Sequence, residues 1–101
     1  MGVRCEFDAE LWETREDGGW TFLSLPEDES EEIRAITGGR SGGGFGAVPV
    51  SVRIGGSSWR TSVFPSAAKG VYVLPVKKQV RTAERVVAGD VVRVAVQLRD
   101  S

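Results

Sequence analysis

The 101-residue sequence contains no histidine and only one cysteine, Cys5. Without histidine, the chain lacks the most common general base and metal ligand at neutral pH, and it cannot form a Ser-His-Asp or Cys-His catalytic group. The lone cysteine excludes an internal disulfide, so folding does not require an oxidising compartment. We therefore predict no catalytic residues, no metal and no cofactor. A carboxylate base such as Glu10 acting with a lysine, or catalysis by pocket shape and electrostatics alone, stays open as an alternative.

The sequence also lacks a long hydrophobic run. No apolar segment approaches the roughly 18–20 residues that a membrane-spanning helix needs, and the N-terminus has no basic segment followed by an apolar one. We expect a soluble, cytoplasmic protein without membrane association. The length predicts a single domain over residues 1–101, which can bury roughly 60–65% of its unfolded surface without disulfides or metals.

Charge is unevenly distributed along the chain, although the net charge is only −1. Residues 1–32 carry 11 acidic and 2 basic side chains, whereas residues 33–101 carry 3 acidic and 11 basic ones. Two interpretations are open. The two parts neutralise each other in the compact fold, or the basic residues form a face that attracts an anion.

Alternation of apolar and polar residues predicts two hairpins. Residues 3–11 alternate cleanly, with Cys5 on the apolar face as an expected buried and unreactive thiol, and residues 20–25 return after a turn at 16–19. Residues 48–54 and 58–64 alternate on either side of a Gly-Gly turn.

A helix of about two turns is expected after Pro26. Asp28 is a plausible N-cap with Glu31 at the capping-box position, and Ile33 and Ile36 would bury one side of the helix. The glycine-rich residues 38–44 lack the GK[ST] ending of a phosphate-binding P-loop, so we interpret them as a flexible connector.

Residues 71–98 predict a strand, a helical turn and a second strand. Residues 65–70 form a loop into this stretch, the first strand is 71–74, and Pro75 ends it. The helical segment 77–83, a turn at 88–90 that requires positive φ at Gly89, and the strand 91–98 follow, with Val76, Val80 and Ala83 on the buried face of the helical segment.

These elements predict a mainly β fold: a small closed β-barrel of about six to seven strands with one short helix and one helical turn. A chain this small and this rich in strands must protect its strand edges, and closure of a barrel does so most completely.

Six short segments follow one another along nearly the whole chain: Phe7-x-Ala9-x-Leu11-Trp12, Trp20-x-Phe22-x-x-Leu25-Pro26, Phe45-Gly46 with Val48, Trp59-Arg60-Thr61-Ser62-Val63-Phe64-Pro65, Tyr72-Val73-Leu74-Pro75-Val76-Lys77-Lys78-x-Val80-Arg81, and Gly89-Asp90-x-Val92. This ordered set resembles the bacterial family called "domain of unknown function 1905". The resemblance implies a closed barrel of about seven strands and brings no established activity. The segment from Leu74-Pro75 to Val92 is also similar to the strand-helix-Gly-Asp pattern of swapped-hairpin AbrB-type DNA-binding barrels, which is an analogy of fold.

Aromatic and basic residues near the expected strand ends are the candidate ligand-binding residues. Most of the rings belong in the core, yet some lie beside polar neighbours, where a barrel of this size opens and can hold one small ligand. The candidates are Trp12, Trp20, Arg40, Arg53, Trp59, Tyr72, Lys77, Lys78 and Arg81.

Three functions remain open from the sequence. The first is binding of an unknown small molecule or anion at one barrel mouth. The second is a protein-interaction module, which could be a homodimer. The third is nucleic-acid binding through the AbrB-like segment, an unlikely partner because the sequence pI of about 5.4 is acidic.

Overall fold

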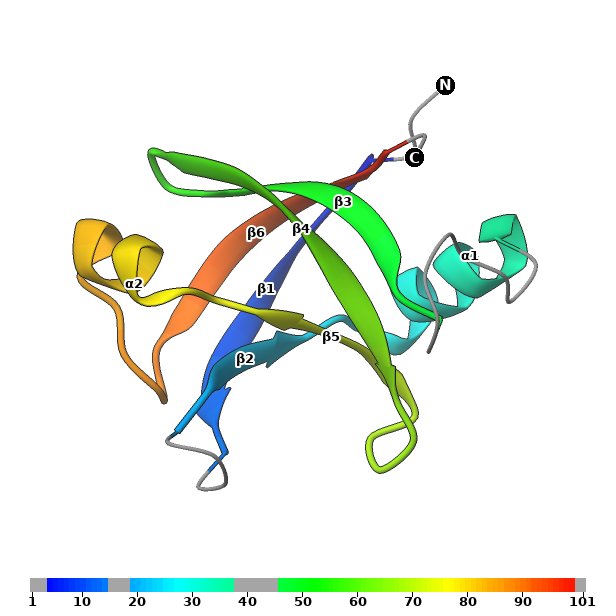
Figure 1. Cartoon of the computed structure of the whole chain (residues 1–101), viewed down its shortest axis with the longest axis horizontal. Helices are drawn as coiled ribbons and strands as arrows, with labels where there is room; N and C mark the ends of the chain where they lie inside the picture. The colour runs from blue at the N-terminus through cyan, green and yellow to red at the C-terminus, as the bar shows by residue number, and fades with distance from the viewer. Residues whose placement is uncertain (1–3, 15–18, 38–45, 100–101) are drawn as a thin grey trace.

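Six strands close into one antiparallel barrel in the order β1–β2–β5–β4–β3–β6, and two helices lie outside it (Figure 1). The structure, a computed structural model, describes residues 4–14, 19–37 and 46–99. The predicted mainly β fold and closed barrel are confirmed, with six strands in the described residues rather than the seven implied by the resemblance. The elements are β1 (Arg4–Glu13), β2 (Thr21–Ser24), α1 (Glu27–Thr37), β3 (Val48–Ile54), β4 (Ser57–Ser66), β5 (Val71–Pro75), α2 (Lys78–Glu84) and β6 (Val91–Leu98).

Both predicted hairpins are present. β1 pairs with β2 with Leu11 opposite Leu23, and β3 pairs with β4 with Val52 opposite Trp59. The turn between β3 and β4 contains Gly55 at φ +59°, a conformation that glycine adopts without steric cost. The two hairpins are joined through β6, which pairs with both β1 and β3, and through the β2–β5 and β4–β5 pairs.

The alternating apolar residues fill the barrel interior, as the period of two along each strand requires. Val50 and Val94 are fully buried, and Leu23 and Leu74 meet at a β2–β5 pair. Burial of this kind stabilises the fold by about 25 cal/mol per Å² of apolar surface removed from water. The buried side chains that the strands contribute to the barrel interior are Phe7, Ala9, Leu11, Leu23, Val48, Val50, Val52, Ile54, Val63, Tyr72, Leu74, Val92, Val94 and Val96.

The two helices lie on opposite sides of the barrel (Figure 1). On the α1 side, Ile33 is 2% exposed, and the buried Ser30 Oγ accepts a hydrogen bond of 3.0 Å from the Tyr72 N–H. The Arg34 guanidinium lies 5.9 Å from the centroid of the Tyr72 ring. On the α2 side, the helix contributes Val80 to the core. The α1 side is therefore filled and hydrogen-bonded.

Several details of the predicted helices and loops are wrong. α1 begins at Glu27 and spans 11 residues, about three turns, so Asp28 lies inside the first turn and is not the N-cap. Ile36 is 50% exposed, because only Ser30 and Ile33 of α1 are buried and the later part of the helix projects away from the barrel (Figure 1). Ala83 is exposed, because α2 buries only Val80.

The segment predicted as a loop at 65–70 begins later than expected. β4 continues through Pro65 and Ser66, which pair with Tyr72 and Val71. The pairing of β4 with β3 ends at Val63, so Pro65 lies where β4 has only one partner strand, as a proline in a sheet usually does. The β4–β5 connection is therefore a hairpin with a turn at 67–70.

Candidate anion-binding site

The strands β4 and β5 separate part-way along their length. They pair at Ser66–Val71, Pro65–Tyr72 and Phe64–Val73, and no pair extends beyond Phe64 in the described ranges. β5 ends at Pro75, which has no N–H to donate. The next N–H, that of Val76, donates to the Thr21 carbonyl of β2 at 2.9 Å instead of turning towards β4.

This separation leaves an opening, which we call the β4–β5 cleft. If the β4–β5 register continued, Thr61 would lie opposite Val76 and Trp59 opposite Lys78. The cleft has a volume of about 370 Å³. It is bounded by residues 59–61 of β4, 75–78 and Arg81 from the end of β5 and α2, and 19–21 at the start of β2.

None of the described residues that line the cleft is acidic. Four cationic side chains line it: Arg60, Lys77, Lys78 and Arg81. The ion pairs within the described residues all involve Arg4 or Arg93, so these four cations have no carboxylate partner there. Two unit charges 4 Å apart attract by about 4 kcal/mol at the effective dielectric constant of a protein surface. The cleft is therefore electrostatically suited to an anion.

The position of Arg81 is fixed by the backbone. Its Nε donates a hydrogen bond of 3.1 Å to the Val76 carbonyl, and the side chain is half-buried. Because only Nε is used in this bond, the guanidinium has further N–H donors for a ligand. A guanidinium can present two parallel donors to a carboxylate or phosphate, which an ammonium group cannot.

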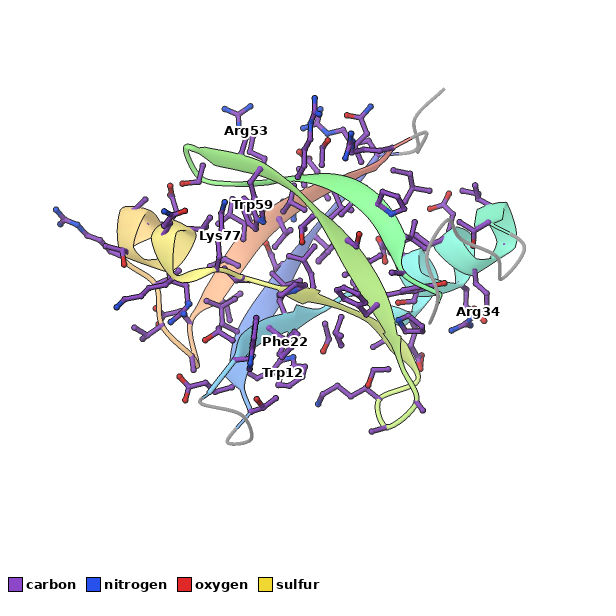
Figure 2. The ribbon with its side chains drawn as sticks, viewed as in Figure 1. Trp12, Phe22, Arg34, Arg53, Trp59 and Lys77 are labelled. Carbon is purple, nitrogen blue, oxygen red and sulfur yellow. The ribbon has the colours of Figure 1, made fainter. Side chains whose placement is uncertain are left out.

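Two indole rings form the apolar walls of the cleft. Trp59 is half-buried and packs against the core, whereas Trp20 is 57% exposed. The Trp20 backbone is held on both sides by Thr14, whose N–H donates to the Trp20 carbonyl at 2.9 Å and whose Oγ1 accepts from the Trp20 N–H at 3.4 Å. Figure 2 shows the Trp59 and Lys77 side chains on the same side of the barrel, next to α2.

The cleft also contains a buried hydroxyl group without a partner. Thr21 is 3% exposed, and its Oγ1 makes no hydrogen bond to any residue in the described ranges. A buried hydroxyl left unsatisfied costs about 1–3 kcal/mol. Its O–H can donate one hydrogen bond and its lone pairs can accept two. Thr21 is also one of the residues that line the cleft.

Glu84 joins α2 to the β3–β4 turn beside the cleft. Its carboxylate accepts hydrogen bonds from Ser57 Oγ at 2.6 Å and from the Gly56 N–H at 3.4 Å. A Cβ atom at Gly55 would collide with this carboxylate, so a larger residue there would displace the Glu84 side chain. The contact fixes α2, which carries Lys78 and Arg81, against the β3–β4 turn.

The nine candidate residues predicted from the sequence do not all gather at this site. Trp12 lies on the outer barrel face, where its ring stacks on Phe22 at 5.1 Å and its Nε1 donates to Ser24 Oγ at 2.9 Å (Figure 2). Tyr72 is buried beneath α1, and Arg40 lies outside the described residues. The structure brings five of the nine to the cleft: Trp20, Trp59, Lys77, Lys78 and Arg81.

Arg53 does not line the cleft but a neighbouring hollow, which shares Trp59 and Arg60 with it. It points outwards from β3 (Figure 2), where it lines a shallow hollow of about 390 Å³ with Arg4 and Arg60. Arg4 is paired with Glu6 at 3.0 Å, and Arg53 Nε donates to the Gly55 carbonyl at 3.4 Å. Two of these three cations are therefore already engaged by the protein.

Sequence reasoning missed Thr21, Arg60 and Glu84. Thr21 shares the inward face of its strand with Leu23 and Leu25, so a polar residue on an apolar face was the available signal. Arg60 lies on the opposite face of β4 from Trp59, so strand alternation does not predict that both line the cleft. No local signal identifies Glu84, because its partners are 27 and 28 residues away.

The described residues offer no site for a metal ion. No group of three or more acidic or cysteine side chains occurs in the ranges 4–14, 19–37 and 46–99 that could hold one. Burial raises the pKa of the Cys5 thiol to about 11, and the carboxylates of Glu29 and Glu32 add to the shift. The thiol is half-buried rather than fully buried as predicted. In the same ranges, no helix has the length and apolar character to cross a membrane.

The model of the family described as "Domain of unknown function (DUF1905)" matches residues 7–96. The chain belongs to this family. The match covers every residue that lines the β4–β5 cleft. It also covers all six strands except residues 4–6 of β1 and 97–98 of β6. No curated protein matches the chain. Family membership gives the fold and no activity, so the function has to be argued from the cleft itself.

Proposed function

We propose that this DUF1905 protein binds a small anion in the β4–β5 cleft. The observation that carries the proposal is the combination, in one hollow, of four cations without carboxylate partners and a buried threonine hydroxyl without a hydrogen-bond partner among the described residues. Cations alone occur on many solvated surfaces, but here a residue that lines the same hollow, Thr21, also carries a buried hydroxyl without a partner among the described residues.

The residues that line the cleft have different expected roles in binding the anion. Arg81 is pre-oriented by its bond to the Val76 carbonyl and can form paired hydrogen bonds to a carboxylate or phosphate. Lys77 and Lys78 are exposed point charges that attract the anion. The described lining contains no carboxylate, thiol or imidazole, so these residues support binding better than catalysis.

Isothermal titration and thermal-shift measurements with inorganic phosphate test this proposal. We expect phosphate to bind and to raise the melting temperature, because a ligand that binds only the folded state stabilises it. The double variant Lys77→Ala with Arg81→Ala should lose at least about tenfold in affinity, since a hydrogen bond to a charged group contributes about 1.5–3 kcal/mol.

Arg53→Ala is the matched control, because it removes a cation outside the cleft and should leave phosphate affinity unchanged. An affinity that survives the double variant, or that falls equally in Arg53→Ala, would show that phosphate is attracted by overall charge and not held in the cleft. Such a result would overturn the proposal.

The two other functions considered from the sequence have less support. Each strand of the described barrel pairs with two neighbours, which leaves few free edges for pairing with another chain. A nucleic-acid partner would require many phosphate contacts and a steep fall of affinity with salt, whereas an anion held in the cleft should show a shallow salt dependence. The proposed setting of this activity is the cytoplasm.

A further inference from the structure

We infer that the anion recognised by the β4–β5 cleft is amphipathic, with one charged head and an unbranched apolar tail that lies along the outside of the barrel. This inference rests on the proposed function of the cleft. It adds the chemical class of the ligand, which the cations of the cleft do not define by themselves.

A second hollow begins beside the cleft and runs over the outer face of β2, β5 and β4. We call it the outer groove, and its volume is about 710 Å³. Its floor follows from strand register: Phe22 pairs with Pro75, and Phe64 pairs with Val73, which is two residues before Pro75 on the same face of β5. Four apolar side chains from three strands therefore lie next to one another on the outside of the barrel.

The outer groove is continuous with the cleft. Trp20, Thr61 and Pro75 line both hollows. Phe64 is 39% exposed in the groove, and Trp20 is 57% exposed where the two hollows meet. Large exposed rings gathered in one hollow mark a binding surface more often than isolated exposed apolar residues do.

Charge defines which part of a ligand each hollow accepts. The described residues that line the groove carry no formal charge, whereas the cleft carries four cations. A ligand that fits both must place its anion in the cleft and its apolar part in the groove. A head group alone would leave the groove rings in water, and an apolar molecule alone would leave the four cations of the cleft without an anion.

Titration calorimetry with methyl, butyl and octyl phosphate, each kept below its micelle concentration, tests the inference. Affinity should rise with chain length by up to about fourfold for each methylene group that is buried. Phe64→Ser should flatten this rise and leave the affinity for methyl phosphate unchanged. Lys77→Ala with Arg81→Ala should lower the affinity for all three ligands by a similar factor.

Val87→Ser is the matched control, because Val87 is 64% exposed and lies outside the groove. It should leave the chain-length dependence as in the unmodified protein. Pro65→Ser, at an exposed position of the groove, provides a second groove variant if Phe64→Ser does not fold.

The possible failures are distinguishable. Binding of methyl phosphate without any gain from a longer chain would overturn the amphipathic ligand and leave the proposed function standing. A gain that persists in both groove variants would also overturn it. Octyl phosphate binding that is unaffected by the cleft double variant would overturn both proposals. Association with anionic phosphatidylglycerol vesicles without binding of monomeric octyl phosphate would count against a free ligand.

Discussion

The α1 side and the α2 side of the barrel contain similar parts but differ in completeness. Two polar side chains are buried in the described residues, one on each side: Ser30 and Thr21. The Ser30 hydroxyl accepts the Tyr72 N–H, whereas the Thr21 hydroxyl has no partner in the described ranges. Tyr72 is 4% exposed on the α1 side, whereas Trp20 is 57% exposed on the α2 side.

The difference shows which side is structural and which side is available for a ligand. On the α1 side, the helix packs Ile33 against the barrel, and its Ser30 hydroxyl accepts a hydrogen bond from the Tyr72 N–H. On the α2 side, the separation of β4 from β5 leaves a cleft lined by rings and cations. Substitutions on the α1 side should therefore change stability, and those on the α2 side should change binding.

The largest expected effect is that of Ile33→Ala on the α1 side. Ile33 is 2% exposed, and truncation of such a side chain costs about 2–5 kcal/mol because it loses buried surface and leaves a cavity. Trp20→Ala on the α2 side should change the free energy of unfolding by no more than about 0.5 kcal/mol, as for other exposed positions. Urea unfolding of both variants measures the contrast, and equal losses would remove the distinction between the two sides.

The two buried hydroxyls give the next contrast. Ser30→Ala should cost about 1–3 kcal/mol, because it leaves the Tyr72 N–H buried without an acceptor. Thr21→Val keeps the shape and removes an unsatisfied group, so the free energy of unfolding should stay the same or rise. Chemical denaturation of the two variants tests this, and a marked loss in Thr21→Val would reveal a structural partner for its hydroxyl.

Gly89→Ala should have a smaller effect. Gly89 has φ +97°, as the sequence predicted for this turn, and its N–H donates to the Leu11 carbonyl at 2.8 Å. No atom lies within 4 Å of an added Cβ, so the expected loss of about 1–2 kcal/mol comes from the backbone alone. Gly56→Ala, which requires no positive φ, is the control. Equal melting temperatures for the two variants would contradict the role of positive φ.

Cys5 should have the smallest effect on stability. Burial and the nearby Glu29 and Glu32 raise its pKa from 9.0 to about 11, so folding favours the protonated thiol. This contribution is complete below pH 9 and is lost as pH rises towards 11. Because the thiolate is the nucleophile, iodoacetamide at pH 8 should alkylate folded protein much more slowly than urea-unfolded protein. Equal rates would place Cys5 in water.

Local patterns predicted most of the fold because they depend on neighbours in the sequence. Alternation predicted both hairpins, and glycine marked the turns at Gly55 and Gly89 correctly, whereas Pro65 lies within β4 rather than in the predicted loop. The start of α1 was misplaced, and Ile36 was wrongly predicted to be buried, because its burial depends on where the helix leaves the barrel. The position of Tyr72 was equally non-local, because α1 covers it from more than 30 residues away.

The composition of the candidate site was only partly predictable. Lys77, Lys78 and Arg81 form a basic segment that is visible in the sequence, and the structure places all three in the cleft. The opening itself depends on where β4 stops pairing with β5, which no single strand encodes. Thr21 and Arg60 line this opening, and strand alternation alone did not predict that they would.

The hydrogen bonds of Glu84 have a consequence for the kinetics of recognition. Because this carboxylate already joins α2 to the β3–β4 turn, α2 and the start of β4 are in position before a ligand arrives. Little conformational entropy remains to be lost on association, so the affinity would be set by contacts rather than by ordering. Association should be a single diffusive step without gating, and differences between ligands should lie in their residence times.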